Sequence, residues 1–389
     1  MARRCDIGIL AAIFIFVVAG AGSGAEETWL RYATVGASGA RNLPMAFNPL
    51  EVSVHPPSDV AMPGFSGWIQ YYGRIESLMS PSGSVAVVLD VGNDNRDIYV
   101  DSNCDGSLAD EKPVKSDVIM YGRTAFGPVK VVFPTDDGPV AYHILPYSGA
   151  PGENFVMYVS SACYYEGTVN VGGVSYGVKL VDTNCNGTFN DAFSKEATSD
   201  TVVLGGPGGE TTLLVGRYVE VGGNLYEAEI ARDGAYVRFS PATDIATGKV
   251  LVPGEVMTLT VAGENGSFSL ASPGGSLTVP AGDYYVQSWT LQRTDDKGIT
   301  WTVYAAAGAD AQAISVTAGG ETALDISDPF KATVDVAFRG GEYVINGGLK
   351  GRLGERIAVT AASRSVAKPE VRITNADGTY DKTFSLEYG

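Results

Sequence analysis

Residues 167–180 read GTVNVGGVSYGVKL, and this stretch indicates which secondary structure the chain forms. Apolar residues alternate with small or polar ones on both sides of the Gly172-Gly173 pair. Because two glycines accept the positive φ angles of a two-residue turn, the stretch predicts a β-hairpin. Residues 216–230 read GRYVEVGGNLYEAEI and repeat the pattern, with a tyrosine three positions after the second glycine in each copy. We therefore expect an internal repeat of hairpins.

Short apolar segments separated by turn residues continue along the 389-residue chain, which contains 49 Gly and 19 Pro. No segment has the periodicity of an amphipathic helix. Residues 26–81 offer a single strand candidate, at 68–75, and we expect the rest of that region to pack irregularly. The predicted fold class is all-β and multi-domain, with antiparallel hairpins and β-sandwich modules. Further strands are predicted at residues 85–91, 97–100, 129–133, 140–145, 155–159, 256–261, 334–338, 343–349, 357–360, 371–374 and 383–386.

A possible calcium loop follows the strand predicted at 97–100, where residues 101–111 read DSNCDGSLADE. In an EF-hand-type loop, side-chain oxygens at positions 1, 3 and 5, the carbonyl of position 7 and a late carboxylate surround the ion, and glycine at position 6 permits the turn. The first loop would supply these ligands from Asp101, Asn103, Asp105, the Ser107 carbonyl, and Asp110 or Glu111.

A second copy with matching spacing occurs at residues 182–191, which read DTNCNGTFND. With two carboxylates where the first loop has four, this copy is expected to bind calcium less tightly. Extracellular calcium sites have Kd values on the order of 0.1 to 1 mM, which suits a stabilising ion. The second loop would supply Asp182, Asn184, Asn186, the Thr188 carbonyl, and Asn190 or Asp191.

Both loops resemble the DxDxDG calcium loops of dockerins and thrombospondin type-3 repeats, over about a dozen residues each. Position 12 is Lys112 in the first copy and Phe193 in the second, so the usual closing glutamate is absent. A strand rather than a helix precedes each loop, which argues against a helix-loop-helix pair. The alternative interpretation is that Asn, Asp and Gly simply build tight turns. The chain also resembles secreted bacterial proteins with this loop type, and that resemblance implies no reaction.

The N-terminus has the pattern of an export signal. Arg3 and Arg4 precede an apolar run at residues 7–18, and small residues follow up to Ala25. This pattern predicts a signal peptide at residues 1–25 and a mature chain that starts at Glu26. An uncleaved membrane anchor is the alternative, but the run is shorter than the roughly 20 apolar residues of a spanning helix. We expect a secreted, periplasmic or cell-surface protein without a transmembrane helix after cleavage.

The chain is acidic, with 27 Lys and Arg residues against 44 Asp and Glu residues. Residues 1–25 contain two of the basic residues and one of the acidic residues, so the predicted mature chain keeps 25 and 43 and has a formal charge of −18. Such a surface disfavours nucleic acid and anionic membranes as partners and favours cations.

Three cysteines, Cys104, Cys163 and Cys185, follow the predicted cleavage site. Cys104 and Cys185 occupy position 4 of the two loops, and we hypothesise that they form a disulfide if the loops lie side by side. A disulfide between Cys163 and either loop is a competing hypothesis, and three buried, unpaired thiols are the third.

The domains are predicted as 26–245, which carries both loops, 246–330, a β-sandwich, and 331–389, a small β unit that could belong to the preceding sandwich. A stretch rich in Pro, Thr and Gly at 240–254 marks the first boundary. Residues 248–320, with a Pro280-Ala-Gly-Asp-Tyr284 turn, resemble the prealbumin-like or Ig-like modules of bacterial surface proteins. That resemblance implies a stalk or display role.

Signals for an enzyme are poor. Ser175 matches a GxSxG motif but lies in a predicted hairpin, where the strand-turn-helix of a nucleophile elbow does not fit. His55 and His143 are the only histidines, and neither lies near a zinc motif; we expect His143 to be structural. Asp182-Thr-Asn184 lacks the glycine of the aspartic-protease motif.

The sequence thus favours an exported, calcium-stabilised β protein with a structural, display or adhesion-like role and an unknown protein or polysaccharide partner. The two alternatives are a secreted hydrolase that acts on polysaccharide and a carbohydrate-binding module. Paired carboxylates in a cleft would distinguish the first, and an exposed aromatic face the second.

Overall fold

The computed structural model describes residues 27–36, 43–93, 96–120, 123–150, 155–195, 198–270, 273–326, 328–339, 341–361 and 366–387. Within these ranges the regular elements are all β-strands, so the predicted all-β class is confirmed. The predicted signal peptide lies outside the described residues. In the described part of the chain we find no helical segment with the length and apolarity that a bilayer crossing requires.

The first large sheet has ten strands and contains most of the elements from residue 48 to residue 161. Its main path runs β3-β12-β11-β9-β8-β7-β6-β5-β4, and β10 pairs with β11. Only Glu51 separates β3 from β4, although they are the two ends of that path, so the sheet curls until its ends approach each other. The strands are β3 (Asn48–Leu50), β4 (Val52–Ser53), β5 (Ile69–Glu76), β6 (Ser84–Val91), β7 (Arg96–Val100), β8 (Val114–Met120), β9 (Arg123–Phe126), β10 (Val129–Thr135), β11 (Gly138–Ser148) and β12 (Met157–Ser161).

Two smaller sheets contain the repeated hairpins. Gly172 and Gly173 have φ angles of 59° and 81°, and Gly222 and Gly223 have 60° and 78°, as the predicted two-residue turns require. One sheet has the order β16-β15-β14-β13-β2 and the other β1-β19-β18-β17. Their strands are β1 (Glu27–Trp29), β2 (Arg31–Thr34), β13 (Cys163–Val171), β14 (Val174–Val181), β15 (Thr201–Gly206), β16 (Gly209–Leu214), β17 (Tyr218–Val221), β18 (Asn224–Ile230) and β19 (Tyr236–Pro241).

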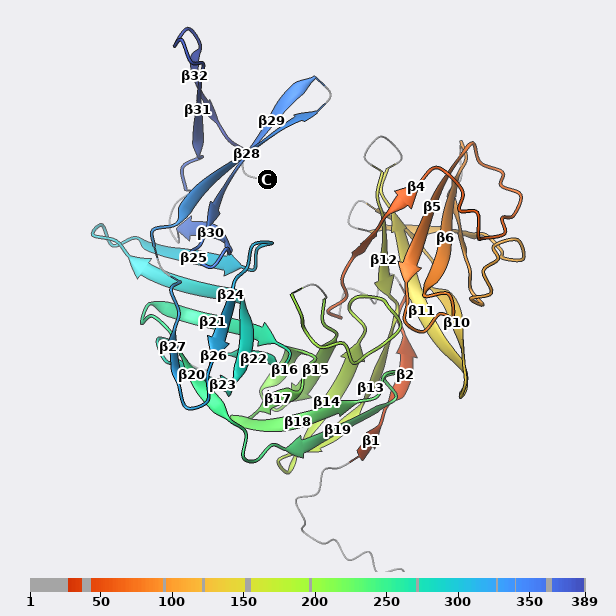
Figure 1. Ribbon diagram of the computed structural model, residues 1–389, viewed down its shortest axis with the longest axis horizontal. Coiled ribbons are helices and arrows are strands. Elements are labelled where there is room, and N and C mark those ends of the chain that lie inside the picture. The colour runs from red at the N-terminus through yellow and green to blue at the C-terminus, as the bar shows by residue number, and fades with distance from the viewer. Residues whose placement is uncertain are drawn as a thin grey trace, which may run out of the picture.

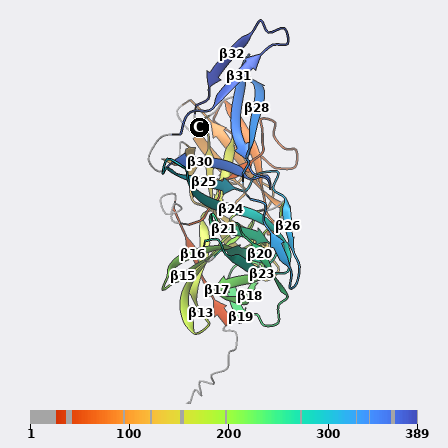
Figure 2. The same ribbon diagram turned by 90° about the vertical axis from the view of Figure 1, so that its left-hand side faces the viewer.

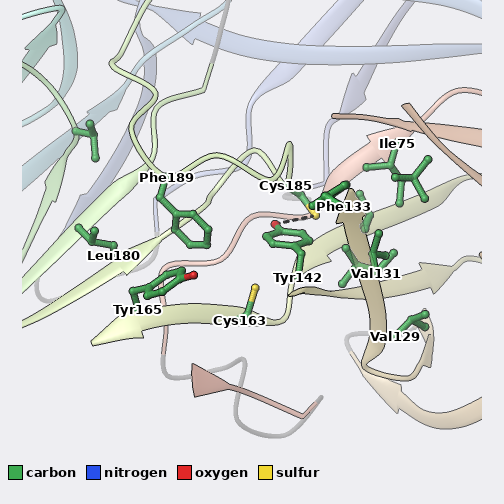
Figure 3. Packing of buried hydrophobic residues seen from close by; sticks show 14 of the residues in the cluster. Ile75, Val129, Val131, Phe133, Tyr142, Cys163, Tyr165, Leu180, Cys185 and Phe189 are labelled. Carbon is green, nitrogen blue, oxygen red and sulfur yellow. Dashed lines mark hydrogen bonds between the residues drawn. The ribbon is translucent and has the colours of Figure 1, made fainter. Parts of the chain in front are cut away.

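One hydrophobic core lies among these three sheets and extends from Leu30 to Phe239. Figure 3 shows its centre, where Tyr142 lies between Phe133 and Phe189, with Cys185 and Cys163 nearby. The alternation of the strands places apolar residues such as Val85, Val87 and Leu89 of β6 in this core. The residues between them, Ala86 and Val88, are buried in a smaller cluster on the other face of the sheet.

A second core is enclosed by two further sheets, which together form a β-sandwich-like arrangement. The smaller sheet has the order β23-β20-β27, and the larger runs β22-β21-β24-β25-β30-β29-β28, with β26 paired to β24. Trp289 lies at the centre, fully buried, and donates its indole N–H to Oε1 of buried Glu355 at 2.8 Å. The strands are β20 (Thr247–Leu251), β21 (Val256–Gly263), β22 (Gly266–Ser269), β23 (Ser276–Pro280), β24 (Gly282–Thr294), β25 (Thr300–Ala306), β26 (Ala313–Val316), β27 (Glu321–Ala323), β28 (Lys331–Arg339), β29 (Glu342–Lys350) and β30 (Arg356–Ala361).

Strand β17 joins the two cores. Tyr218 packs in the second core and its neighbour Val219 in the first, because successive side chains of a strand point to opposite faces. The backbone N–H groups of Arg217 and Tyr218 donate to the carbonyls of Glu264 and Asn265, at 3.1 and 3.0 Å. The contact between the two parts is therefore continuous in both packing and hydrogen bonding.

The N-terminal region differs from its prediction. Instead of packing irregularly, residues 27–53 add four short strands to edges of three sheets: β1 to β19, β2 to β13, β3 to β12 and β4 to β5. Strands of two to four residues are too short to show an alternating pattern, so the pairing partner decides their conformation.

The sheets follow one another along a curved path (Figure 1). The ten-stranded sheet lies at one end. At the other end the hairpin β28–β29 and the separate hairpin of β31 (Glu370–Thr374) and β32 (Asp381–Ser385) extend away from the second core, as Figure 2 also shows.

The turn between β18 and β19 allows a packing test with a matched control. A Cβ at Gly234 (φ 80°) would lie 2.6 Å from the Tyr165 ring and 2.8 Å from the Phe189 ring, whereas one at Gly223 (φ 78°) would meet nothing within 4 Å. Both alanine variants carry the left-handed backbone cost of about 1–2 kcal/mol, and Gly234→Ala adds an overpacking cost of about 1–3 kcal/mol. Urea denaturation should show the larger loss for Gly234→Ala; equal losses would contradict the packing.

Candidate metal-binding loops

The first predicted calcium loop leaves β7 at a buried aspartate. The backbone N–H of Asp101 donates to the carbonyl of Ala86 at 2.9 Å, which anchors the start of the loop on the sheet. Its carboxylate is turned into the loop, where it accepts the backbone N–H groups of Asp105 at 3.1 Å and Gly106 at 3.0 Å. The side chain at position 1 therefore hydrogen-bonds the backbone at positions 5 and 6 of the loop.

Positions 3 and 5 of the first loop continue this arrangement. Asn103 Oδ1 accepts the N–H of Asp105 at 3.2 Å, and Asp105 Oδ1 accepts the N–H of Ser107 at 2.8 Å. Cys104 and Gly106 have left-handed φ angles of 56° and 81°. The backbone thus winds around the side-chain oxygens of positions 1, 3 and 5, as a cation-binding loop requires.

The second loop has nearly the same hydrogen-bonding scheme. Asp182 accepts the N–H groups of Cys185 at 2.6 Å and Gly187 at 2.8 Å. Asn184 Oδ1 accepts the N–H of Asn186 at 3.1 Å, and Asn186 Oδ1 that of Thr188 at 2.8 Å. Cys185 and Gly187 again have positive φ angles, 62° and 91°. The sequence repeat is therefore also a structural repeat.

Side chains of the second loop converge on the carboxylate of Asp191. Its Oδ2 accepts hydrogen bonds from Asn184 Nδ2 at 3.0 Å, Asn186 Nδ2 at 2.6 Å and Thr188 Oγ1 at 2.9 Å. Positions 3, 5, 7 and 10 thus surround one point, with oxygens of the kind that calcium prefers on each side chain. The residues present fit a calcium ion, and Asp191 rather than Asn190, which is exposed, is the late carboxylate of this loop.

The late acids of the first loop are placed differently. Glu111 Oε1 accepts the backbone N–H of Ser102 at 2.6 Å and so closes the loop by a hydrogen bond, while Asp110 is exposed. Ser107 forms a parallel bridge with Ala61. The side chains of positions 1, 3 and 5 are brought together in this loop, and Asp110 lies at its surface.

Sequence analysis missed Asp200, which ties the two ends of the second loop together. Its Oδ1 accepts the N–H of Thr183 at 3.1 Å, and its Oδ2 accepts the N–H of Asp191 at 2.9 Å. The phenol of Tyr142, from β11, donates to Asp182 Oδ2 at 2.6 Å. The one sequence signal for Asp200 is its place directly before the apolar strand at 201–206. Nothing in the sequence links Tyr142 to the loop.

Burial dominates the electrostatics of the second loop. Asp182 and Asp200 are fully buried. Desolvation raises the pKa of the Asp182 carboxyl to about 7, although the hydrogen bonds from Tyr142 and the backbone oppose this shift. Desolvation, followed by the charge of Asp182, raises the pKa of Asp200 to about 9. A nearby cation would compensate these buried negative charges.

The predicted disulfide between Cys104 and Cys185 is wrong. Cys104, Cys163 and Cys185 are all free and buried, which was the third hypothesis. Cys104 and Cys185 are both part of the first core, where each thiol packs beneath its own loop. Cys163 Sγ lies 3.5 Å from the carbonyl oxygen of His143. Burial raises the pKa of the Cys104 and Cys163 thiols to about 11, so both stay protonated at neutral pH.

The residues weighed for catalysis have structural positions. Ser175 lies within β14, paired with Asn170 across the hairpin. His143 lies within β11, and its Nδ1 is 2.7 Å from the hydroxyl of Tyr32. Desolvation lowers the pKa of His143, so the imidazole is neutral at neutral pH.

A groove with a volume of about 1080 Å³ lies beside the second loop, at the place where the ends of the ten-stranded sheet approach each other. Asn184 and Asn186 of the loop form part of its wall. The segment around β3, β4 and β5 supplies most of the other lining residues. Apolar side chains such as Leu50, Val52 and Ile75 are among them, and the polar, charged and aromatic ones include Asn48, Glu51, His55, Tyr72, Arg74 and Glu76.

The chain matches no protein-family model, no curated protein and no solved structure. Across the residues that the structure describes, no three His, Cys, Asp or Glu side chains gather as a metal-binding group. Much of each predicted ligand set consists of amide, hydroxyl and carbonyl oxygens, which do not belong to those four residue types.

The buried carboxyls predict a decrease in stability with rising pH when calcium is chelated. Asp182 and Asp200 bind protons in the folded state up to about pH 7 and 9, whereas in the unfolded chain they ionise near the ordinary 3.8. Their stabilisation is therefore complete below pH 4 and lost as the pH rises through the folded values. In EDTA, the free energy of unfolding should fall between pH 7 and 9 by up to about 1.4 kcal/mol per pH unit for each proton.

The window above pH 7 avoids the opposite contribution of His143, whose lowered pKa lies below 6.5. Asp200→Asn should flatten the pH dependence, and Asp377→Asn, in an exposed turn, should leave it unchanged. Stability that rises over this window in the wild type would contradict the raised pKa values.

Proposed function

We propose that the protein is an exported β scaffold, stabilised by calcium, with a structural, display or interaction role at the cell exterior. The observation that carries this proposal is the shared hydrogen-bonding scheme of the two loops, each of which follows the second strand of a hairpin. An ordinary turn needs one hydrogen bond between an Asn or Asp side chain and the backbone, whereas each of these loops directs the side-chain oxygens of positions 1, 3 and 5 inward.

Calcium would be held in the first loop by Asp101, Asn103, Asp105 and the Ser107 carbonyl, and in the second by Asp182, Asn184, Asn186 and Asp191. When bound, the ion would supply positive charge beside the buried carboxylates of Asp101 in the first loop and Asp182 in the second. A formal charge of −17 for the whole chain favours cation binding electrostatically. An ion that binds only the folded loop raises stability by mass action.

The display role is supported by the sandwich that contains the second core. The resemblance to prealbumin-like modules depends on the turn between β23 and β24, where the Tyr284 hydroxyl donates to the Pro280 carbonyl at 2.8 Å. Tyr284 is fully buried, so this bond fixes the turn to the core. Modules of that type carry other domains, and this use agrees with the predicted export signal.

A second candidate function, polysaccharide binding, is favoured by the groove beside the second loop. Asn184 and Asn186 line the groove and are also proposed calcium ligands. Carboxylates, an amide and an aromatic ring around a groove of this size are the groups that hydrogen-bond and stack on sugars. Calcium bound at the second loop would order this wall of the groove.

The calcium proposal predicts a thermal shift. At a calcium concentration ten times a Kd on the order of 0.5 mM, each site would add about 1.4 kcal/mol, or about 3–6 °C in Tm for a domain of this size. Tm measured by differential scanning calorimetry should therefore be higher in 5 mM calcium chloride than in EDTA. An unchanged Tm in the wild type would refute the proposal.

Two variants localise this effect. Asp105→Asn keeps an acceptor for the N–H of Ser107 but removes a charged ligand, so it should abolish much of the calcium shift. Asp377→Asn is the matched control, because Asp377 Oδ1 accepts the N–H of Thr379 in an exposed turn with the same local geometry. The control should keep the full shift, and a loss in both variants would indicate a nonspecific charge effect.

Polysaccharide binding can be measured by co-sedimentation with insoluble cellulose, chitin and peptidoglycan. Binding to at least one polymer is expected, with a several-fold loss in EDTA and in Glu51→Gln, which changes a groove residue. Asp377→Asn should bind like the wild type. If the protein co-sediments with none of the three polymers, this second function is contradicted, and the calcium proposal is unaffected.

A further inference from the structure

The hairpin β28–β29, which we call the arm, extends beyond the eight-stranded sheet (Figures 1 and 2). Strand β29 pairs with β30 only through Leu349 and Lys350, whereas β28 and β29 pair with each other along nine residues. An isolated two-stranded hairpin is marginally stable in water. Among the residues that the structure describes, no further strand therefore pairs with the outer part of the arm.

One face of the arm is apolar. The cross-strand pairs Val336–Ile345 and Phe338–Tyr343 lie on it, together with Val334 opposite Gly347. Phe338 and Tyr343 contact each other at the tip, with ring centroids 4.9 Å apart. The exposed fractions of the apolar side chains are high: 55% for Val334, 60% for Val336, 64% for Phe338 and 74% for Tyr343.

The opposite face of the arm is mixed. Asp335 pairs with Asn346 there and Thr333 with Gly348, while Ala337 pairs with Val344, which is 41% exposed. The larger apolar side chains are therefore concentrated on the first face, as in a sheet of which one face packs against a second layer. Exposed apolar patches of this kind on soluble proteins mark interaction sites.

We propose that the apolar face of the arm packs against the same face of a second copy of this chain. In an isologous contact with the two-fold axis at the Val336–Ile345 pair, Phe338 of one arm lies over Val334 of the other. Tyr343 likewise lies over Gly347 and the Leu386 side chain that covers it; a Cβ at Gly347 would be 2.6 Å from Leu386 Cδ1. The two aromatic side chains at the tip of one arm thus meet Val334 and Leu386 nearer the base of the other.

Charge favours a second copy at this face rather than along the free edge of β28. Although the chain is strongly acidic, the six residues of the three cross-strand pairs on the apolar face carry no charge, so these pairs bring no like charges together. Symmetric antiparallel pairing of two β28 edges centred on Asp335 would place this carboxylate opposite its own copy, which is unfavourable. Face-to-face packing avoids that repulsion.

The area of the face indicates a reversible dimer. At about 200 Å² for each aromatic side chain, the exposed parts of Phe338 and Tyr343 amount to roughly 280 Å². With the two valines, a pair of arms would bury on the order of 800 Å² in total, below the roughly 1,200–2,000 Å² of stable interfaces. We therefore expect a Kd on the order of 10–100 µM.

Sedimentation velocity of the intact protein tests the proposal at concentrations from about 1 to 300 µM. The wild type should convert from monomer to dimer, and Val336→Asp and Phe338→Ser should each raise the dimer Kd at least about tenfold. Asn346→Lys, which adds a charge to the opposite face of the same hairpin, should leave the Kd unchanged. Because Val336, Phe338 and Asn346 are exposed and lie outside both cores, all three variants should keep the wild-type Tm at low concentration.

Cross-linking tests the position of the axis. In the Val336→Cys variant, the new thiol should be joined to its copy by a short bismaleimide that spans the roughly 10 Å between packed sheets. The Asn346→Cys variant should not be cross-linked. The native thiols are buried and serve as the unreactive background. A wild type that stays monomeric at 300 µM, a dimer unaffected by Val336→Asp, or cross-linking through Asn346→Cys alone would overturn the proposal. None of these outcomes depends on calcium.

Discussion

The first core depends on the hydrogen bonds that the buried carboxylate of Asp182 accepts. This carboxylate is fully buried and accepts the backbone N–H groups of Cys185 and Gly187 and the hydroxyl of Tyr142. Without these donors a buried carboxylate would cost several kcal/mol. The loop, strand β11 and the surrounding aromatic rings therefore have to assemble together, and the second loop is part of the core.

The two loops are connected to hairpins, and the turn that follows β17–β18 contacts the second loop. Each loop continues the second strand of a hairpin, and the hairpin β17–β18 continues instead into a plain turn. That turn packs on the second loop: the carbonyl of Arg232 accepts the N–H of Phe189 at 2.9 Å, and Gly234 lies against the Phe189 and Tyr165 rings. Calcium at the second loop would thus stabilise the contact between two sheets as well as the loop itself.

The second part of the molecule has a different character. Its core is closed by apolar side chains around Trp289, and the buried acid Glu355 accepts the hydrogen bond of the indole. The arm then extends from the edge of this sandwich with an apolar face open to solvent. The proposed contact through the arm agrees with the proposed display or interaction role.

The sequence by itself determined the all-β class, the hairpins and the spacing of the two loops, because period-two alternation, Gly-Gly turns and Asx residues act over neighbouring positions. It did not determine the strands at residues 27–53, which depend on distant partners, or the roles of Asp200 and Tyr142. It also left the cysteine pairing open. Only the tertiary structure placed each thiol beneath its own loop, set Asp110 and Asn190 at the surface and brought Asp191 into the second loop. Burial, electrostatic shifts and contacts between distant strands are properties of three-dimensional packing, which a local pattern does not contain.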